Sequence, residues 1–212
     1  MQRTAALITF LLLVQVSYAE PDRAQTQAAM ENYFAGEVRG GYVLVGMGTT
    51  GLLSGGLLYG LQKDSDLARG MSYPLLGFGL AHVAAGIFVT VSSNKRVDEF
   101  GDQIASDPQT FVTAERGRMK GVSMQFTVLE IVEVVLIAGG ITTAVLARRA
   151  DRRQLEGIGY GVALEAALTL GFDIVAGRRA HGYRGDLAGL DVSTALDPAG
   201  RPLVMVTHSG AF

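Results

Sequence analysis

Four long apolar segments constrain the fold of this chain more than any other feature. Charged residues are rare in them, and they make up only 18% of the whole chain, against about 25% in soluble domains. A spanning helix needs about 20 consecutive apolar residues, and each segment meets that length. The segments run from Gly40 to Gln62, Met71 to Asn94, Gly121 to Ala147 and Gly157 to Gly177. The sequence therefore predicts an all-α membrane protein with a four-transmembrane-helix bundle at residues 40–177.

Residues 1–19 have the three parts of a secretory signal peptide. Arg3 supplies a positive charge, residues 5–16 form an apolar stretch, and Ser17 and Ala19 place small residues ahead of a cleavage site. The apolar stretch has about a dozen residues, which is short for a hydrocarbon core of about 30 Å. We expect cleavage before Glu20, and an uncleaved N-terminal anchor is the alternative.

The loop after the third apolar segment indicates which way the chain crosses the membrane. Residues 148–153 read RRADRR and form the most basic short loop of the sequence. Cytoplasmic loops carry an excess of Lys and Arg, so this loop is expected in the cytoplasm. An exported N-terminus followed by four crossings leads to the same orientation. The prediction is a protein of a bacterial-type inner membrane with both mature termini on the outer side.

Two further segments are predicted on the outer side. Residues 20–39 read as an amphipathic helix that lies on the membrane surface or against the bundle. Residues 95–120 read as an outer loop of mixed charge, in which Asp107 and Pro108 mark the start of a helix. The apolar face of the amphipathic helix consists of Met30, Tyr33, Phe34 and Val38.

The tail at residues 178–212 changes character. Residues 190–196 and 203–208 resemble short strands on either side of residues 197–200, whose sequence DPAG suits a type I turn. The sequence predicts a small β-hairpin on the outer side. A single hairpin is marginally stable in water, so it is expected to pack on the bundle or on a partner.

Glycines at helical spacing occur in the first apolar segment. Gly51 and Gly55 are four residues apart, and so are Gly56 and Gly60. Small residues at this spacing let a neighbouring helix approach closely. These four glycines are predicted to pack helices.

The second half of the chain resembles the first. Gly70 and Tyr73 lie at the start of the second apolar segment, as Gly157 and Tyr160 lie at the start of the fourth. Residues 55–56 and residues 139–140 are both Gly-Gly pairs. The sequence suggests a duplicated helical hairpin with both copies in one orientation, with chance similarity between apolar segments as the alternative.

Ionisable residues inside the predicted spans are the main functional lead. His82, Glu130, Glu133 and Glu165 are predicted at similar depth, while Asp173 lies nearer the outer surface. A charge at the centre of a spanning helix costs roughly 2.5–3.5 kcal/mol even on the lenient insertion scale. These side chains are therefore expected to face the bundle interior, with at least one of the glutamates protonated.

Two interpretations of this group stay open. In the first, the side chains make hydrogen bonds between helices that lock the bundle or bind a partner's helix. In the second, they form a proton relay or a cation site, and nitrogen and carboxylate ligands could also hold a metal ion. No Glu-x-x-His pair occurs, so the signature of di-metal bundles is absent.

Several other classes of function are excluded or unsupported. The chain has no cysteine, and its net charge of −2 does not suit a nucleic-acid partner. Residues 42–51 spell the glycine pattern of a dinucleotide site, but there is no room for a helix and second strand before Asp66. We therefore expect no nucleotide and no organic cofactor, and no motif argues for an enzyme.

The sequence as a whole favours a structural or accessory subunit of a cell-envelope assembly. Its expected partners are membrane lipid and either a protein partner or further copies of this chain. The alternative is a proton- or cation-coupled channel or transporter that uses His82, Glu130, Glu133 and Glu165.

Overall fold

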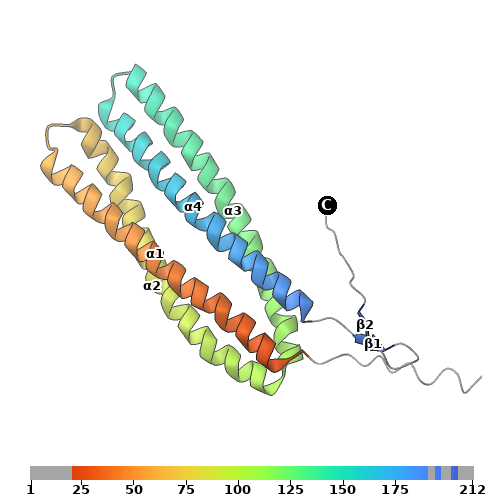
Figure 1. Ribbon diagram of the computed structural model, residues 1–212. Helices are drawn as coiled ribbons and strands as arrows, with labels where there is room; N and C mark the ends of the chain where they lie inside the picture. The colour runs from red at the N-terminus through yellow and green to blue at the C-terminus, as the bar shows by residue number, and fades with distance from the viewer. Residues whose placement is uncertain (1–20, 191–193, 197–201, 205–212) are drawn as a thin grey trace, which may run out of the picture.

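Four long helices make up almost all of the structure, a computed structural model that describes residues 21–190, 194–196 and 202–204 (Figure 1). The predicted signal peptide and the turn of the predicted hairpin lie outside the described residues. The helices are α1 (Arg23–Leu61), α2 (Asp66–Ser106), α3 (Pro108–Arg149) and α4 (Arg153–Gly189). All four are long and apolar enough to cross a membrane, which confirms the four predicted transmembrane helices.

The helices are arranged as two antiparallel hairpins, α1 with α2 and α3 with α4, and α2 also packs along α4 (Figure 1). The start of α1, the α2–α3 turn and the end of α4 lie together at what we call the terminal end. The α1–α2 and α3–α4 connections lie together at the opposite end, which we call the loop end. Because α2 and α4 both run from the loop end to the terminal end, they are parallel to each other.

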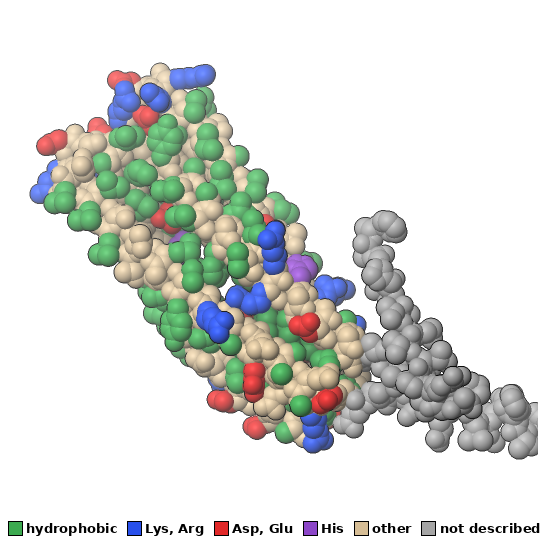
Figure 2. Space-filling model, in the orientation of Figure 1, with side chains coloured by type: hydrophobic (Ala, Val, Ile, Leu, Met, Phe, Trp, Pro, Cys, Tyr) green, Lys and Arg blue, Asp and Glu red, His purple; other side chains and the backbone are tan. Residues whose placement is uncertain are grey.

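The helices are much longer than a bilayer is thick. They contain 37 to 42 residues, which corresponds to about 55–63 Å at about 1.5 Å per residue, against a hydrocarbon core of about 30 Å. Large exposed apolar side chains all fall within residues 42–61, 67–91, 124–146 and 155–175. We call this part the apolar belt; Figure 2 shows its hydrophobic side chains, with charged groups gathered toward both ends. Such a surface is compatible with a membrane-embedded protein.

Beyond the apolar belt, at the terminal end, the four helices continue as what we call the terminal extension (residues 23–39, 95–120 and 178–189). It has its own apolar core, in which the Tyr33 and Tyr183 rings stack 4.4 Å apart and Phe100 meets Phe111 edge to face. The buried members are Met30, Tyr33, Phe34, Ile104, Phe111, Val112, Met119, Ala180, Tyr183 and Leu187. The extension is therefore built like a water-soluble helical bundle.

The terminal extension differs from what the sequence suggested for residues 20–39. The amphipathic helix does not end before the first span, because α1 runs unbroken from Arg23 to Leu61. Met30, Tyr33 and Phe34 from its apolar face are buried in the core of the extension. This segment therefore packs as part of the helical bundle.

Residues 95–120 likewise form helices, and only Asp107 separates α2 from α3. The Asp107 carboxylate caps α3 by accepting hydrogen bonds from the Thr110 backbone N–H (3.0 Å) and hydroxyl (2.7 Å), with Pro108 following in the first turn. The same hydrogen bonds lower the pKa of Asp107. The predicted helix start at Asp107 and Pro108 is confirmed.

Glycines bring α1 and α2 into backbone contact. A Cβ added to Gly48 would lie 2.5 Å from the Gly79 carbonyl oxygen, and one added to Gly41 would lie 2.8 Å from that of Gly86. Gly51 and Gly55 also face α2, whereas a Cβ at Gly56 or Gly60 would meet nothing within 4 Å. The dinucleotide-like pattern at residues 42–51 lies inside α1.

The two hairpins meet through glycines near the loop end. A Cβ on Gly70 would collide with the backbone of Gln154, and a Cβ on Gly157 would collide with the backbone of Leu67. Within the second hairpin, Gly140 faces Gly159 in the same manner. All three helix pairs therefore depend on positions without a side chain.

Two short strands follow the bundle. They are β1 (Thr194–Leu196) and β2 (Pro202–Val204), which pair antiparallel with Ala195 opposite Leu203. The connecting residues lie outside the described part of the chain, so the predicted hairpin turn stays a prediction.

Replacing Gly48 with leucine is expected to destabilise the protein by at least about 2 kcal/mol, because its side chain has no space against α2 and must push the helices apart. The matched control is Gly46→Leu, two residues away in α1, where a Cβ would meet nothing within 4 Å. Unfolding in detergent, followed by circular dichroism, measures both. Equal stability of the two variants would contradict this account of α1–α2 packing.

Candidate functional site

The ionisable residues within the apolar belt form two groups, both of which involve α4. His82 of α2 lies beside Glu165, with 3.9 Å between the imidazole Nδ1 and Glu165 Oε2. Glu133 of α3 instead interacts with Asp173, two helical turns further along α4. The structure thus separates Glu133 from the His82–Glu165 pair and brings in Asp173.

The His82 imidazole is held by a hydrogen bond across the α2–α4 interface. Its Nε2 lies 3.0 Å from the Thr169 hydroxyl oxygen, and that hydroxyl lies 2.8 Å from the Glu165 backbone carbonyl. Because the Thr169 hydroxyl donates to this carbonyl, the Nε2–H of His82 is the donor to Thr169. Nδ1 then carries the lone pair in the neutral ring, and it is buried without a hydrogen-bond partner.

The Glu165 side chain occupies a space that a glycine leaves open. Only 3% of Glu165 is exposed, and its Oε1 would lie 3.3 Å from a Cβ added to Gly51 of α1. Gly51 therefore allows the carboxyl group to sit between α1, α2 and α4. A larger residue at position 51 would compete with Glu165 for this space.

Glu133 and Asp173 form the second group, at the α3–α4 interface. They are 5% and 6% exposed, and their carboxyl groups lie close enough to interact electrostatically. Two neighbouring carboxyl groups in a poor dielectric cannot both be ionised, so one of them carries a proton. Glu133 Oε2 is nevertheless buried with no hydrogen-bond partner. Glu130 lies on the same interface, since its Oε1 would be 3.4 Å from a Cβ on Gly177. Three acidic residues therefore lie along the α3–α4 interface.

A cavity of about 180 Å³ leads from this acidic group toward the terminal end. Asp173 and Phe172 line it within the apolar belt, and Glu37 and Arg179 line it where the belt meets the terminal extension. Its lining is Tyr33, Glu37, Gly40, Leu44, Val89, Phe126, Phe172, Asp173, Ala176 and Arg179. The cavity places Asp173 within reach of polar groups outside the apolar belt.

Glu37 accepts two hydrogen bonds at the end of this cavity that lies in the terminal extension. Its two carboxylate oxygens accept hydrogen bonds from the Tyr33 hydroxyl and the Ser93 hydroxyl, each at 2.6 Å. Burial, and then the charge of Glu37 and its hydrogen bond, raise the pKa of Tyr33 well above its usual value of 10.0. Tyr33 therefore stays protonated and acts as a hydrogen-bond donor at ordinary pH.

The arrangement suits proton binding better than metal binding. Among the residues that the structure describes, no three His, Asp or Glu side chains come close enough together to hold a metal ion. The acidic group contains only oxygen ligands, and His82 lies with Glu165 instead. The carboxyl groups of Glu133 and Asp173 can share a proton, and the His82 imidazole can accept one.

Sequence reasoning set Asp173 aside and did not consider Thr169. Depth alone placed Asp173 nearer the surface, but depth does not determine which neighbour a side chain meets. A signal was present, because Glu165, Thr169 and Asp173 are each four residues apart and therefore share one face of a helix. That spacing would have identified a single polar face on α4.

No protein-family model, curated protein or solved structure matches the chain.

Replacing Thr169 with valine is expected to destabilise the protein by about 1–3 kcal/mol, because it leaves the buried Nε2–H of His82 without an acceptor. Thr142→Val is the matched control, since the Thr142 hydroxyl bonds only to the Ala138 carbonyl of its own helix. Thermal unfolding in detergent compares the two variants. A loss of stability as large in Thr142→Val would show that the His82 contact contributes nothing specific.

Proposed function

We propose that this protein binds and transfers protons, or a small cation in their place, at Glu133 and Asp173 within the membrane. The observation that carries the proposal is the buried, unpartnered Oε2 of Glu133, whose neighbour Asp173 lines a cavity. This is the proton- or cation-coupled alternative considered for the sequence. The geometry favours it over a purely structural role for the acids.

The chemistry of the pair supports the proposal. Two carboxyl groups in contact in a poor dielectric cannot both be ionised unless a cation joins them. The pair therefore retains one proton, and an unpartnered oxygen is a ready acceptor for a second proton or a cation. A carboxyl group with only a structural role would be expected to have both oxygens satisfied.

Polar residues on one face of α4 could extend a proton route from Asp173 toward the loop end. Asp173, Thr169 and Glu165 succeed one another at intervals of four residues, or about 6 Å along the helix axis. The Nδ1 of His82 faces Glu165 at 3.9 Å, so a small shift of either side chain would bring them within hydrogen-bond distance. Together with the cavity above Asp173, these groups outline a route along α4.

The relation between the two hairpins also supports a transport role. Gly157 follows Gly70 by 87 positions. Thr169 follows His82 by the same interval, so the hydrogen bond between them joins matching positions of the two hairpins. The contacts of Gly70 and Gly157 are likewise reciprocal. We interpret the hairpins as two copies of one unit, related by an axis along the membrane normal, an architecture found in transporters. At this interval the positions that match Glu133 and Asp173 in the first copy are Gly46 and Gly86, so this acidic pair occurs in the second copy alone.

A structural or accessory subunit remains the second candidate function, supported by a separate observation. Gly56 and Gly60 are exposed on α1 and face no other helix of this chain. In lipid, such a small-residue face suits the close approach of a helix from another subunit. The terminal extension offers less for this role than the sequence suggested, because its apolar side chains are buried in its own core.

The proposed location is a bacterial-type inner membrane within the cell envelope. The arginines of residues 148–153 would place the loop end in the cytoplasm. The terminal extension would then project from the outer surface, as the predicted signal peptide requires. In this orientation the cavity above Asp173 opens toward the outer side.

Asp173→Asn and Glu133→Gln are each expected to reduce proton flux to the level of protein-free liposomes, because an amide cannot exchange the transferred proton. The full chain is reconstituted with a pH-sensitive dye inside the liposomes, and a potassium diffusion potential drives the flux. The control variant is Glu99→Gln, an exposed glutamate of the terminal extension. A wild-type flux equal to that of protein-free liposomes, or full flux in Asp173→Asn, would refute the proposal.

The second candidate function predicts that Gly60→Leu releases a bound subunit, because leucine fills the open face of α1. Gly77→Leu on α2 is the matched control, since a Cβ there would also meet nothing within 4 Å. Native mass spectrometry of protein extracted from its own membranes in mild detergent gives the stoichiometry. The same mass for wild type and both variants would argue against a subunit bound at this face.

A further inference from the structure

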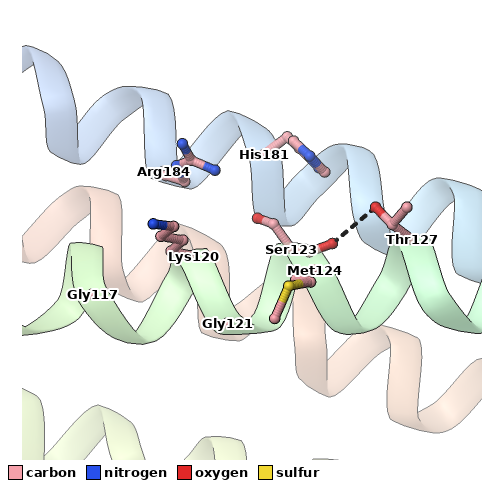
Figure 3. Close-up of a pocket in the computed structure, with 8 residues that line it drawn as sticks. All are labelled: Gly117, Lys120, Gly121, Ser123, Met124, Thr127, His181 and Arg184. Carbon is pink, nitrogen blue, oxygen red and sulfur yellow. Dashed lines mark hydrogen bonds between the residues drawn. The ribbon is translucent and has the colours of Figure 1, made fainter.

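A basic groove lies between α3 and α4 where the apolar belt meets the terminal extension (Figure 3). Its volume is about 470 Å³. Lys120 of α3 and Arg184 of α4 lie on opposite sides of it, and Figure 3 shows their charged groups close to one another. Its lining consists of Gly117, Lys120, Gly121, Ser123, Met124, Thr127, His181 and Arg184.

Within the described part of the chain, neither cation of the groove forms an ion pair with a carboxylate. No lining residue is acidic, and no described Asp or Glu forms an ion pair with Lys120 or Arg184. The nearby Arg118 differs in this respect, because it forms a bidentate pair with Glu115. Two unneutralised cations on facing helices indicate an anionic occupant.

A buried hydroxyl within the groove lacks a partner. Ser123 is 4% exposed, and its Oγ makes no hydrogen bond. Its backbone carbonyl is already used, because it accepts a hydrogen bond from the Thr127 hydroxyl. In Figure 3 the Ser123 side chain lies between the α3 and α4 ribbons, beside Lys120. Buried hydroxyl groups are almost always satisfied, so Ser123 also points to a missing polar ligand.

The floor of the groove is open because glycines form it. A Cβ at Gly117 or Gly121 would meet nothing within 4 Å, so these glycines are not required for helix packing. They leave room for a ligand against the α3 backbone. The His181 ring is drawn back onto its own helix by a hydrogen bond of 2.8 Å between Nδ1 and the Gly177 carbonyl.

The depth of the groove identifies the source of the anion. Met124, one turn from Lys120, is 68% exposed and belongs to the apolar belt. Lys120 and Arg184 therefore lie at the level of lipid headgroups, above side chains that contact acyl chains. We propose that the groove binds the phosphate group of an anionic phospholipid, with Lys120 and Arg184 on the phosphate oxygens and the Ser123 hydroxyl as a third donor. The acyl chains then lie along Met124.

This site is separate from the acidic group at Glu133 and Asp173, and its test does not depend on proton flux. The full chain, delipidated in mild detergent, is titrated with phosphatidylglycerol or phosphatidylcholine and observed by native mass spectrometry. We expect phosphatidylglycerol to bind more tightly. The double variant Lys120→Gln/Arg184→Gln is expected to lose about 25-fold in affinity, because each cation near an anionic lipid contributes about fivefold.

Two further variants make the test specific to the groove. Gly121→Leu keeps both charges and fills the open floor, so it is expected to reduce binding while circular dichroism stays unchanged. Lys95→Gln/Arg96→Gln removes two charges elsewhere on the terminal extension and is expected to bind like the wild type. Equal affinity for the two lipids, or full binding by the Lys120/Arg184 or Gly121 variants, would overturn the proposal. Displacement of the lipid by millimolar inorganic phosphate would overturn it in favour of a free-phosphate site.

Discussion

The structure depends on close contact between helix backbones at glycine positions. In lipid, helices gain little from burying apolar side chains, since the surrounding acyl chains are equally apolar. Gly41 and Gly48 meet Gly86 and Gly79, and their backbones approach so closely that a Cβ could not be accommodated. The apolar side chains of the belt are then free to face outward, and most of the large ones do. Beyond the belt the same four helices change to the packing of soluble proteins, with Phe34, Phe111 and Met119 buried in a common core. Each helix thus follows two packing rules along its length.

Glycines also provide the space in which acidic side chains can be buried. The carboxyl group of Glu165 lies against Gly51, and that of Glu130 lies against Gly177. A helix interface tight enough to hold the bundle together leaves little room for a long polar side chain, unless the facing residue has none. Glu165 and Glu130 therefore lie opposite glycines, and the buried acids Glu133, Glu165 and Asp173 are enclosed between helices. This confinement gives the unpartnered oxygen of Glu133 its significance, because lipid cannot hydrogen-bond it and water reaches it only through the protein.

Much of the fold could be predicted from the sequence, because absence of charge over about 20 residues has few physical explanations. The helix cap at Asp107 could also be predicted, because Asp followed by Pro favours a helix start through local interactions alone. The continuity of α1 and α2 beyond the membrane was not predicted. Charged residues in 20–39 and 95–120 suggested surface segments, whereas they form the polar outside of a bundle whose core is shared by four helices. The partners of the acids depend on helix rotation as well as on depth. The sequence therefore placed His82 and Glu133 together, although they contact different residues of α4.

The unbroken passage of α1 from the terminal extension into the membrane has a mechanical consequence. Residues 23–39 extend for about 25 Å at about 1.5 Å per residue, with no loop to absorb a change in direction. A tilt of about 5° within the membrane would therefore move the far tip by roughly 2 Å, by the same geometry. Residues 23–39 therefore move together with the part of α1 that lies in the apolar belt. Any change in the direction of α1 within the apolar belt would therefore be carried to residues 23–39.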